Sequence, residues 1–304
     1  YDTVAVIGCG LIGSSMLRAI RARGAATHLV AVDASPEVRA RVEALGLADR
    51  VADDPAAAVA EADLVILATP PGVIAAALEA LAPALKPGAT VTDVGSVKGA
   101  VADAFAALPP GVHPVPGHPI AGTERSGPDA GFAELFDGRW TILCPLERPG
   151  DDYAVAVAAL SAFWRRLGAT VELMDARHHD LVLAVTSHLP HLIAYNIVGT
   201  AADLEEVAQA EVMKFSAGGF RDFTRIAASD PVMWRDVFLL NKDAVLEILA
   251  RFTEDLQALS RSIRWGEGDK LEALFARTRE IRRGIVAAGQ ESAEPNFGRD
   301  RGKS

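Results

Sequence analysis

The stretch that decides the fold is VAVIGCGLIGSS, residues 4–15. Its first four residues are apolar and predict a buried strand, and three glycines follow in the spacing G-x-G-x-x-G before a helical pattern. In such a turn the first glycine permits the tight bend, the second lets a pyrophosphate approach the backbone, and the third lets helix and strand pack closely. The helix N-terminus attracts the negative charge. The stretch therefore predicts a dinucleotide site formed by Gly8, Gly10, Leu11, Ile12 and Gly13.

The next predicted strand, HLVAVD, ends on Asp33, twenty residues after Gly13. A carboxylate at this point can bond both ribose hydroxyls and repels a 2′-phosphate, so NAD is expected rather than NADP. The run ADLVILATPPG contains a further predicted strand, and Thr69 and Pro70, which follow that strand, are expected to line the cofactor groove. The PPG turn could equally begin the next helix.

Short β-branched runs alternate with Ala-rich helical patterns as far as Asp175, which indicates an α/β fold with a doubly wound, mainly parallel sheet. After Asp175 the strand signals end, and helices are predicted over about 177–202, 204–215, 231–264 and 268–288. We therefore expect a Rossmann-type NAD-binding domain over 1–175, an all-helical domain over 176–290 and a flexible tail over 291–304.

Composition excludes several classes of protein. Half of the 304 residues are hydrophobic, so the chain is neither disordered nor fibrous, and the 30 basic against 40 acidic residues argue against nucleic-acid binding. Two cysteines suit a reducing compartment and argue against a disulfide framework or a zinc site. The apolar stretches are interrupted before spanning length and no secretory signal opens the chain, so a cytoplasmic protein without membrane association is expected.

Two further strand ends carry polar residues: DVGSVKG with Ser96 and Lys98, and GHPIAGTE with His118 and Glu124. Ligands of an open α/β sheet bind beyond such ends. Ser96 can cap a helix or orient a neighbour, and Lys98 is expected to be a solvated lysine in the first helical turn. Three nearby prolines restrict the backbone around His118, which favours a positioned reagent over a turn histidine.

The helical half opens with TSHLPHLIAYN, in which His188 and His191 are three residues apart and hence on one helix face. Pro190 lies between them and is expected to kink the helix and free the Thr186 carbonyl. The pair could form a partly polar core face or bind a metal, but no third ligand is evident and no metal is expected.

The run GGFRDFTRIAASDP contains Asp222 and Arg225 three residues apart. They could form an internal ion pair. Alternatively, Asp222 could orient the Arg225 guanidinium so that it binds a substrate carboxylate through two parallel N–H groups. In a chain of net charge −10, substrate binding is favoured over an internal ion pair.

Together the runs VIGCGLIGSS, DVGSVKG, GHPIAGTERSG, SHLPH and GGFRDFTRIAASDPVMWRDVFLLNK resemble the prephenate and arogenate (cyclohexadienyl) dehydrogenase family of tyrosine biosynthesis. The resemblance extends in order from Val4 to about Ala288. It implies a Rossmann domain followed by an all-helical dimerisation domain, and hence a homodimer.

The resemblance also assigns roles to particular residues. His118 matches the family's catalytic histidine and Ser96 the serine that assists it, while Arg225 matches the arginine that binds a substrate carboxylate. His191 matches a substrate-site histidine, with His188 beside it on the same face. Three more residues fall at family positions near the substrate: Glu124, Asp222 and Trp234.

The implied activity is NAD-dependent oxidative decarboxylation of a small dicarboxylate, prephenate or arogenate, to 4-hydroxyphenylpyruvate or tyrosine. Such a reaction needs a base for the carbinol proton, and neutral His118 is the candidate, with Ser96 fixing its tautomer. One alternative is an NAD-dependent β-hydroxyacid dehydrogenase, which would use Lys214 or Lys242. The other alternative is a protein that senses NAD without catalysis.

Overall fold

A computed structural model describes residues 1–123, 125–148, 150–203, 211 and 218–287. By its internal contacts the chain divides into two compact units, Tyr1–Leu246 and Glu247–Ser304. The first unit contains the sheets and the first helices of the region that was expected to be all-helical. The boundary at residue 175 stays a prediction.

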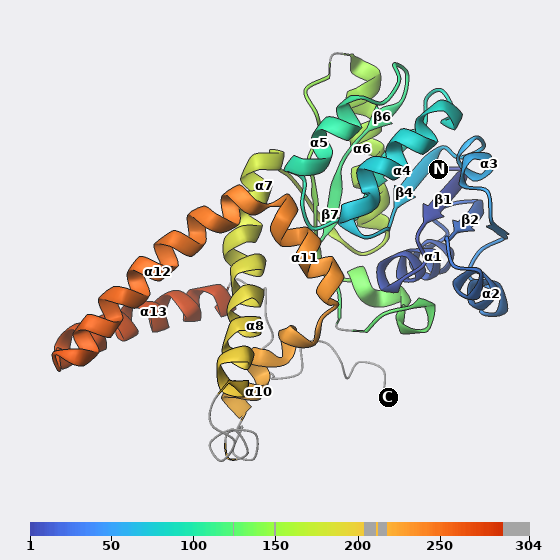
Figure 1. Ribbon diagram of the computed structural model, residues 1–304. Helices are drawn as coiled ribbons and strands as arrows, with labels where there is room; N and C mark the ends of the chain where they lie inside the picture. The colour runs from blue at the N-terminus through green and yellow to red at the C-terminus, as the bar shows by residue number, and fades with distance from the viewer. Residues whose placement is uncertain (124, 149, 204–210, 212–217, 288–304) are drawn as a thin grey trace. The chain divides into compact units, whose positions relative to one another are not determined.

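The larger sheet has six parallel strands in the order β3-β2-β1-β4-β5-β6, with the order reversing next to β1 (Figure 1). These strands are β1 (Thr3–Ile7), β2 (His28–Val32), β3 (Arg50–Ala52), β4 (Leu64–Leu67), β5 (Thr90–Asp93) and β6 (His113–Pro114). The doubly wound parallel sheet is therefore confirmed. Only the three-residue β3 lacks a predicted counterpart.

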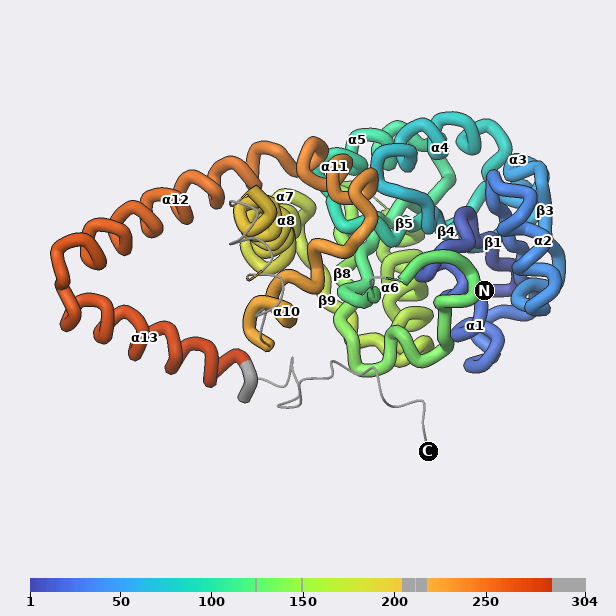
Figure 2. The backbone as a smooth tube through the Cα atoms, turned by 60° about the horizontal axis from the view of Figure 1, so that its bottom comes forward, coloured from blue at the N-terminus to red at the C-terminus, as the bar shows by residue number. Residues whose placement is uncertain are grey.

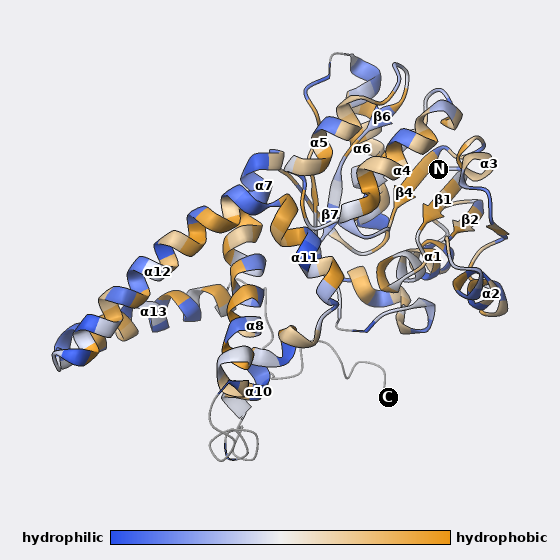
Figure 3. Ribbon diagram, viewed as in Figure 1, coloured by the Kyte–Doolittle hydropathy of each residue, from blue (hydrophilic) through white to orange (hydrophobic). Residues whose placement is uncertain are grey.

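Helices cover both faces of this sheet, as Figure 2 shows. One face packs against α1 (Leu11–Arg23), α2 (Pro36–Ala44) and α6 (Asp151–Arg166), the other against α3 (Pro55–Val59), α4 (Ile74–Leu81) and α5 (Gly99–Ala106). Because both faces are covered, β1 and β4 are hydrophobic along their length (Figure 3). Single 3-10 turns complete the connections: η1 (Pro71–Val73), η2 (Ala82–Ala84), η3 (Pro128–Ala130) and η4 (Ala133–Phe136).

A smaller sheet contains β7 (Gly117–Pro119), β8 (Trp140–Leu143) and β9 (Thr170–Leu173), with β7 antiparallel to β8. The run VHPVPG, residues 112–117, therefore contributes to both sheets, through β6 and the first residue of β7. His118 pairs with Ile142, so it lies inside strand β7, whereas the sequence predicts it beyond the end of a strand.

The helical region starts with α7 (Ala176–Leu183), a π-helical turn (Ala184–His188) and α8 (Leu189–Ala202). The backbone thus widens into a π-helical turn before Pro190, where a kink at the proline had been expected. By length and composition Ala176–Ala202 could cross a membrane, contrary to the expectation that every apolar run is interrupted. The same composition is found in core helices of soluble proteins, and this run carries buried histidines and an aspartate, so it does not by itself indicate a membrane.

The remaining described helices are α10 (Gly218–Thr224), η6 (Arg225–Ala228), α11 (Pro231–Leu240), α12 (Lys242–Arg264) and α13 (Gly268–Ala287). Asp230 caps α11 by accepting from the backbone N–H of Met233 at 2.7 Å. The single helix expected over 231–264 is divided at Asn241. Most of the helix expected over 204–215 and the whole tail over 291–304 lie outside the described residues.

Candidate active site

The glycine-rich turn has the geometry that its sequence predicts. Gly8 has a φ of +97°, and a Cβ there would lie 2.6 Å from the Ala68 carbonyl oxygen. A Cβ on Gly13 would lie 1.9 Å from the Gly8 carbonyl oxygen, so helix α1 can approach the strand only without a side chain. A Cβ on Gly10 would meet no atom within 4 Å, which leaves open space at the start of α1.

The ribose and groove residues also fit a dinucleotide. The Asp33 carboxylate accepts from the backbone N–H groups of Cys9 at 2.8 Å and Ser35 at 2.9 Å, which fixes it beside the glycine turn. Thr69 follows β4, and its buried hydroxyl has no hydrogen-bond partner within the part of the chain that the structure describes. Pro70 is exposed and leads into η1, so the PPG turn also begins a helical segment. A site with open space at a helix N-terminus and an unsatisfied hydroxyl fits a bound phosphate-containing ligand.

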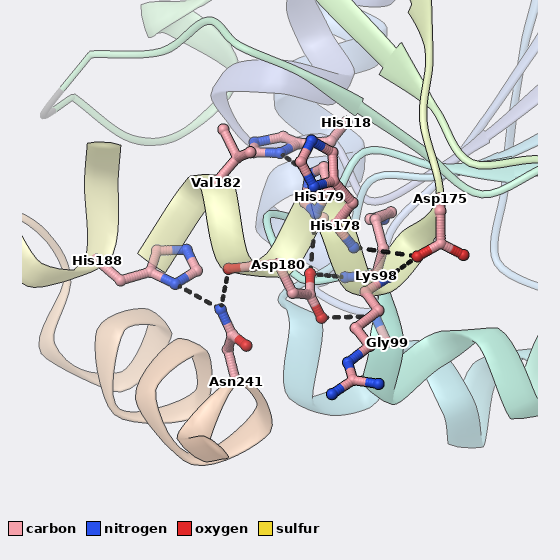
Figure 4. A network of polar contacts seen from close by, with 12 residues as sticks. Lys98, Gly99, His118, Asp175, His178, His179, Asp180, Val182, His188 and Asn241 are labelled. Atoms are coloured by element: carbon pink, nitrogen blue, oxygen red, sulfur yellow. Dashed lines mark hydrogen bonds and ion pairs between the residues drawn. The ribbon is translucent and has the colours of Figure 1, made fainter. Parts of the chain in front are cut away.

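His118 is the first member of a chain of buried side chains (Figure 4). Its Nδ1 lies 2.9 Å from Nε2 of His179, and Nδ1 of His179 lies 2.8 Å from Oδ1 of Asp180. The Asp180 carboxylate also accepts from the backbone N–H groups of Lys98 at 2.8 Å and Gly99 at 2.7 Å. Strand β7 thus contributes one histidine, and α7 contributes the second histidine and the carboxylate.

The ionised carboxylate fixes the tautomers along this chain. Asp180 can only accept, so His179 carries its proton on Nδ1 and presents a bare Nε2. That nitrogen accepts from His118, which therefore carries its proton on Nδ1 and has a lone pair on Nε2. His118 Nε2 is consequently available as a base.

Burial keeps the two histidines neutral. Burial lowers the pKa of His118 well below its usual 6.5, and the Lys98 ammonium group and the neighbouring titratable rings of His179 and His188 lower it further. Burial also lowers the pKa of His179, although the hydrogen bond that His179 donates to Asp180 raises it. For Asp180, burial raises the pKa, but hydrogen bonds from His179, Lys98 and Gly99 outweigh it and hold the pKa below its usual value. The site therefore combines neutral imidazoles with an ionised carboxylate.

Lys98 is fully buried and forms an ion pair with the fully buried Asp93 at the end of β5. The expectation of a solvated lysine is wrong, because its ammonium group also donates to the Gly117 carbonyl at 2.8 Å. Asp93 accepts from the Gly117 N–H at 3.1 Å. The ion pair thus binds both backbone polar groups of the residue before His118 and holds β7 at the carboxyl end of β5.

Ser96 is half-buried in the same connection but does not cap α5. Asp180 takes that role from a distant helix, through the N–H groups of Lys98 and Gly99. Among the described hydrogen bonds, none joins Ser96 to His118, and the contact that fixes the tautomer of His118 comes from His179.

His188 is fully buried at the end of the π-helical turn. Its Nδ1 accepts from the Asn241 amide at 3.0 Å, and the same amide donates to the Asp180 carbonyl at 2.9 Å. Burial lowers the pKa of His188 to about 4. Asn241, at the break between α11 and α12, therefore connects the helix that carries Asp180 to His188.

His191 and Trp234 form the other end of the site. Their rings stack with centroids 3.6 Å apart, and His188 meets the same indole edge-on at 6.0 Å, so both histidines share one helix face as expected. The His191 Nδ1 donates to the Ser187 carbonyl at 2.9 Å, which leaves its Nε2 as an acceptor. Burial lowers the pKa of His191, and the charge of Arg225 lowers it further despite the bond to Ser187.

Arg225 is half-buried at the first residue of η6, which packs beside α8. Asp222 is exposed, and its carboxylate lies 3.9 Å from the Arg221 guanidinium. Glu124 lies outside the described residues. Of the two lysines that a β-hydroxyacid dehydrogenase would use, Lys214 also lies outside the described residues, and Lys242 is exposed on α12. No group of three potential metal ligands occurs in the described part of the chain.

Sequence reasoning missed His179, Asp180 and Asn241. The first two belong to the run DARHHDL, where an Asp-capped helix begins with adjacent histidines and a second aspartate. This concentration of ionisable residues next to an apolar helix was the available signal. Asn241 gave none, because only the break between two helices makes it a buried donor.

Comparisons with known proteins cover nearly the whole chain. The family models "Prephenate dehydrogenase, nucleotide-binding domain" and "Prephenate dehydrogenase, dimerization domain" match residues 16–173 and 175–277. A cyclohexadienyl dehydrogenase from Zymomonas mobilis is 44% identical over 93% of this chain and 95% of its own length.

Two solved structures have the same fold. Prephenate dehydrogenase from A. aeolicus, in complex with hydroxyphenyl propionate and NAD+, superimposes with a TM-score of 0.86 at 33% identity over 94% of this chain and 98% of that one. Synechocystis arogenate dehydrogenase gives a TM-score of 0.79 at 28% identity over 93% and 99% of the two chains. On this sequence and structural evidence, the chain belongs to the prephenate dehydrogenase family.

Proposed function

We propose that this chain catalyses the NAD-dependent oxidative decarboxylation of prephenate, arogenate or both, giving 4-hydroxyphenylpyruvate or tyrosine. The observation that carries the proposal is the neutral His118, whose Nε2 is left as a base by the bond from its Nδ1 to His179. A base of this kind typically accelerates such proton transfers by about 10²- to 10⁴-fold.

The protein's residues then have distinct tasks in the reaction. NAD, when bound, accepts the hydride from the ring carbinol carbon. His118 Nε2 takes the carbinol proton, and loss of the ring carboxylate as carbon dioxide makes the ring aromatic. Arg225 binds the side-chain carboxylate, since its guanidinium fork matches the geometry of a carboxylate.

Choice of cofactor and substrate rests on separate observations. Asp33, held by two backbone N–H groups beside the glycine turn, favours ribose hydroxyls over a 2′-phosphate. The A. aeolicus relative was solved with NAD+. Because the compared proteins include a cyclohexadienyl and an arogenate dehydrogenase, both a keto and an amino side chain belong in the substrate proposal.

A homodimer is part of the same proposal. The second family model is described as a dimerization domain. Figure 3 shows hydrophobic residues along α12 and α13. Large apolar side chains that are at least 47% exposed on these helices include Leu256, Ile263, Phe275, Ile281 and Ile285. Such exposed apolar residues on two helices suit burial against a second copy. We keep the helical domain at 176–290 and a cytoplasmic location as further parts of the proposal.

The test is NADH formation, followed by absorbance, with prephenate, arogenate and a panel of β-hydroxyacids. The proposal is supported if the wild type oxidises prephenate or arogenate but none of the β-hydroxyacids. Oxidation of β-hydroxyacids would support a β-hydroxyacid dehydrogenase, and NAD binding without oxidation of any of these compounds would support an NAD sensor. His118→Asn should lower kcat by about 10²- to 10⁴-fold while NAD affinity stays unchanged. Equal loss of NAD binding would give His118 a structural role.

A further inference from the structure

His118 is hydrogen-bonded on the side away from substrate to His179, which is in turn hydrogen-bonded to Asp180. We propose that His179 is a second proton acceptor: when His118 Nε2 takes the carbinol proton, the Nδ1 proton of His118 moves to His179 Nε2, and Asp180 holds the resulting imidazolium. The inference rests on the proposed function and adds two residues to it. Asp180 is a positioning residue in this scheme.

The transfer balances without any additional reactant. The carbinol O–H bond breaks as the N–H bond at His118 Nε2 forms, and the His118 Nδ1–H bond breaks as the N–H bond at His179 Nε2 forms. The two electrons of the carbinol C–H bond leave with the hydride. His118 ends neutral with its proton on Nε2, and one positive charge lies on His179. The 2.9 Å separation of the two nitrogens is an ordinary hydrogen-bond distance, so no side chain has to move.

The charges around the two rings favour this direction. His118 lies near the Lys98 ammonium group, which opposes a positive charge on it. His179 also faces Lys98, but it is bonded to Asp180 and lies near Asp93, and both carboxylates favour a positive charge there. Moving the proton one step therefore transfers the charge from His118, which has no carboxylate partner among the described residues, to His179, whose Nδ1 lies 2.8 Å from Asp180.

Asp180 is suited to keep its own charge during the step. Its carboxylate accepts from two backbone N–H groups at the start of α5 in addition to His179. These donors come from main chain and cannot rotate away, so the negative charge is held in place beside His179 before substrate binds. The carboxylate stabilises the imidazolium and does not need to take the proton.

The decisive variant is His179→Gln. Glutamine can place its amide oxygen near the position of Nε2 and accept from His118, so it preserves the tautomer of His118 but cannot accept a proton. The matched control is His178→Gln, an exposed histidine on the same helix turn. In single-turnover NADH formation we expect His179→Gln to slow the reaction by about 10- to 100-fold with KM and NAD affinity unchanged, and His178→Gln to react like the wild type.

Two readouts separate proton relay from simple packing. When the single-turnover rate is plotted against the fraction of D2O in the solvent, the wild type should give a curved plot, because two protons move in the step. The plot for His179→Gln should be a straight line, because only one proton moves. In the free enzyme, NMR of 15N-labelled histidine should show His118 protonated on Nδ1, both in the wild type and in His179→Gln. A wild-type rate in His179→Gln, a linear wild-type dependence on D2O, or a His118 proton on Nε2 would each overturn the relay.

Failure of the relay is distinguishable from failure of the proposed function. If the wild type oxidises neither prephenate nor arogenate, the function is wrong, and the NMR result still tests the hydrogen-bonded chain. If His118→Asn is inactive while His179→Gln reacts at the wild-type rate, the function stands and His118 acts as a single base.

Discussion

The burial of His188 predicts that the protein loses stability in mild acid. The ring is fully buried, its Nδ1 accepts from Asn241, and its pKa is lowered to about 4 because burial disfavours the charged form. The Asp180 carboxylate acts in the opposite direction, and the neighbouring rings of His179 and His191, which become cationic only when they are protonated, lower the pKa further. Protonation would also replace the acceptor on Nδ1 with a second donor facing the Asn241 amide.

The magnitude follows from the difference between the folded and unfolded pKa. Relative to the ordinary 6.5, the folded value is lower by about 2.5 units, and each unit corresponds to about 1.36 kcal/mol. The unfolded chain binds the proton more tightly, so the stability contributed by His188 is fully present above pH 6.5 and decreases as the pH falls through about 4. The loss is about 2 kcal/mol by pH 5 and about 3 kcal/mol by pH 4.

The measurement is urea unfolding between pH 7.5 and 4.5 at fixed protein concentration, for the wild type and His188→Gln. Glutamine can still accept from Asn241 but does not titrate, so its free energy of unfolding should decrease about 2 kcal/mol less than that of the wild type between pH 7.5 and 5. His178→Gln is the exposed control and should follow the wild-type curve. If the difference between wild type and His188→Gln is the same at every pH, the burial argument is refuted.

Two other substitutions test the two ends of the site. Arg225→Ala should raise KM for prephenate or arogenate by about 10- to 100-fold with a smaller change in kcat, because it leaves a substrate carboxylate unpaired; an unchanged KM would remove Arg225 from the site. Gly13→Ala should destabilise the fold, since its Cβ would lie 1.9 Å from the Gly8 carbonyl oxygen, whereas Gly10→Ala should preserve the melting temperature and weaken NAD binding. Equal effects of the two alanines, measured by thermal unfolding and NAD titration, would contradict these separate roles.

The nucleotide half of the site could be predicted because its information is local. Gly8, Gly10 and Gly13 lie within six consecutive residues, and the turn that they form depends on their own backbone and on the adjacent strand. Asp33 directly follows the neighbouring strand in a parallel sheet, so its position follows from the sheet topology. Patterns of this kind transfer from sequence to structure without knowledge of distant contacts.

The other half depends on contacts across the chain that no local pattern contains. Lys98 has the sequence context of a solvated residue at a helix start, and it is buried only because Asp93 and the Gly117 carbonyl both face its ammonium group. His118 and His179 are 61 residues apart in the sequence, and Asp180 caps a helix that begins 81 residues earlier, at Gly99. The partners that determine protonation therefore become visible only once the tertiary structure is known.

Asp180 combines three roles that experiments must separate. Its carboxylate caps α5 and orients His179, while its backbone carbonyl accepts from Asn241, the residue that also holds His188. Removing this carboxylate would leave two backbone N–H groups of α5 without an acceptor and would also change the tautomer of His179. Lost activity in an Asp180 variant would thus report folding and catalysis together. His179 has hydrogen-bonded side-chain contacts only with His118 and Asp180 among the described residues, so His179→Gln is the change that isolates the proton-transfer step.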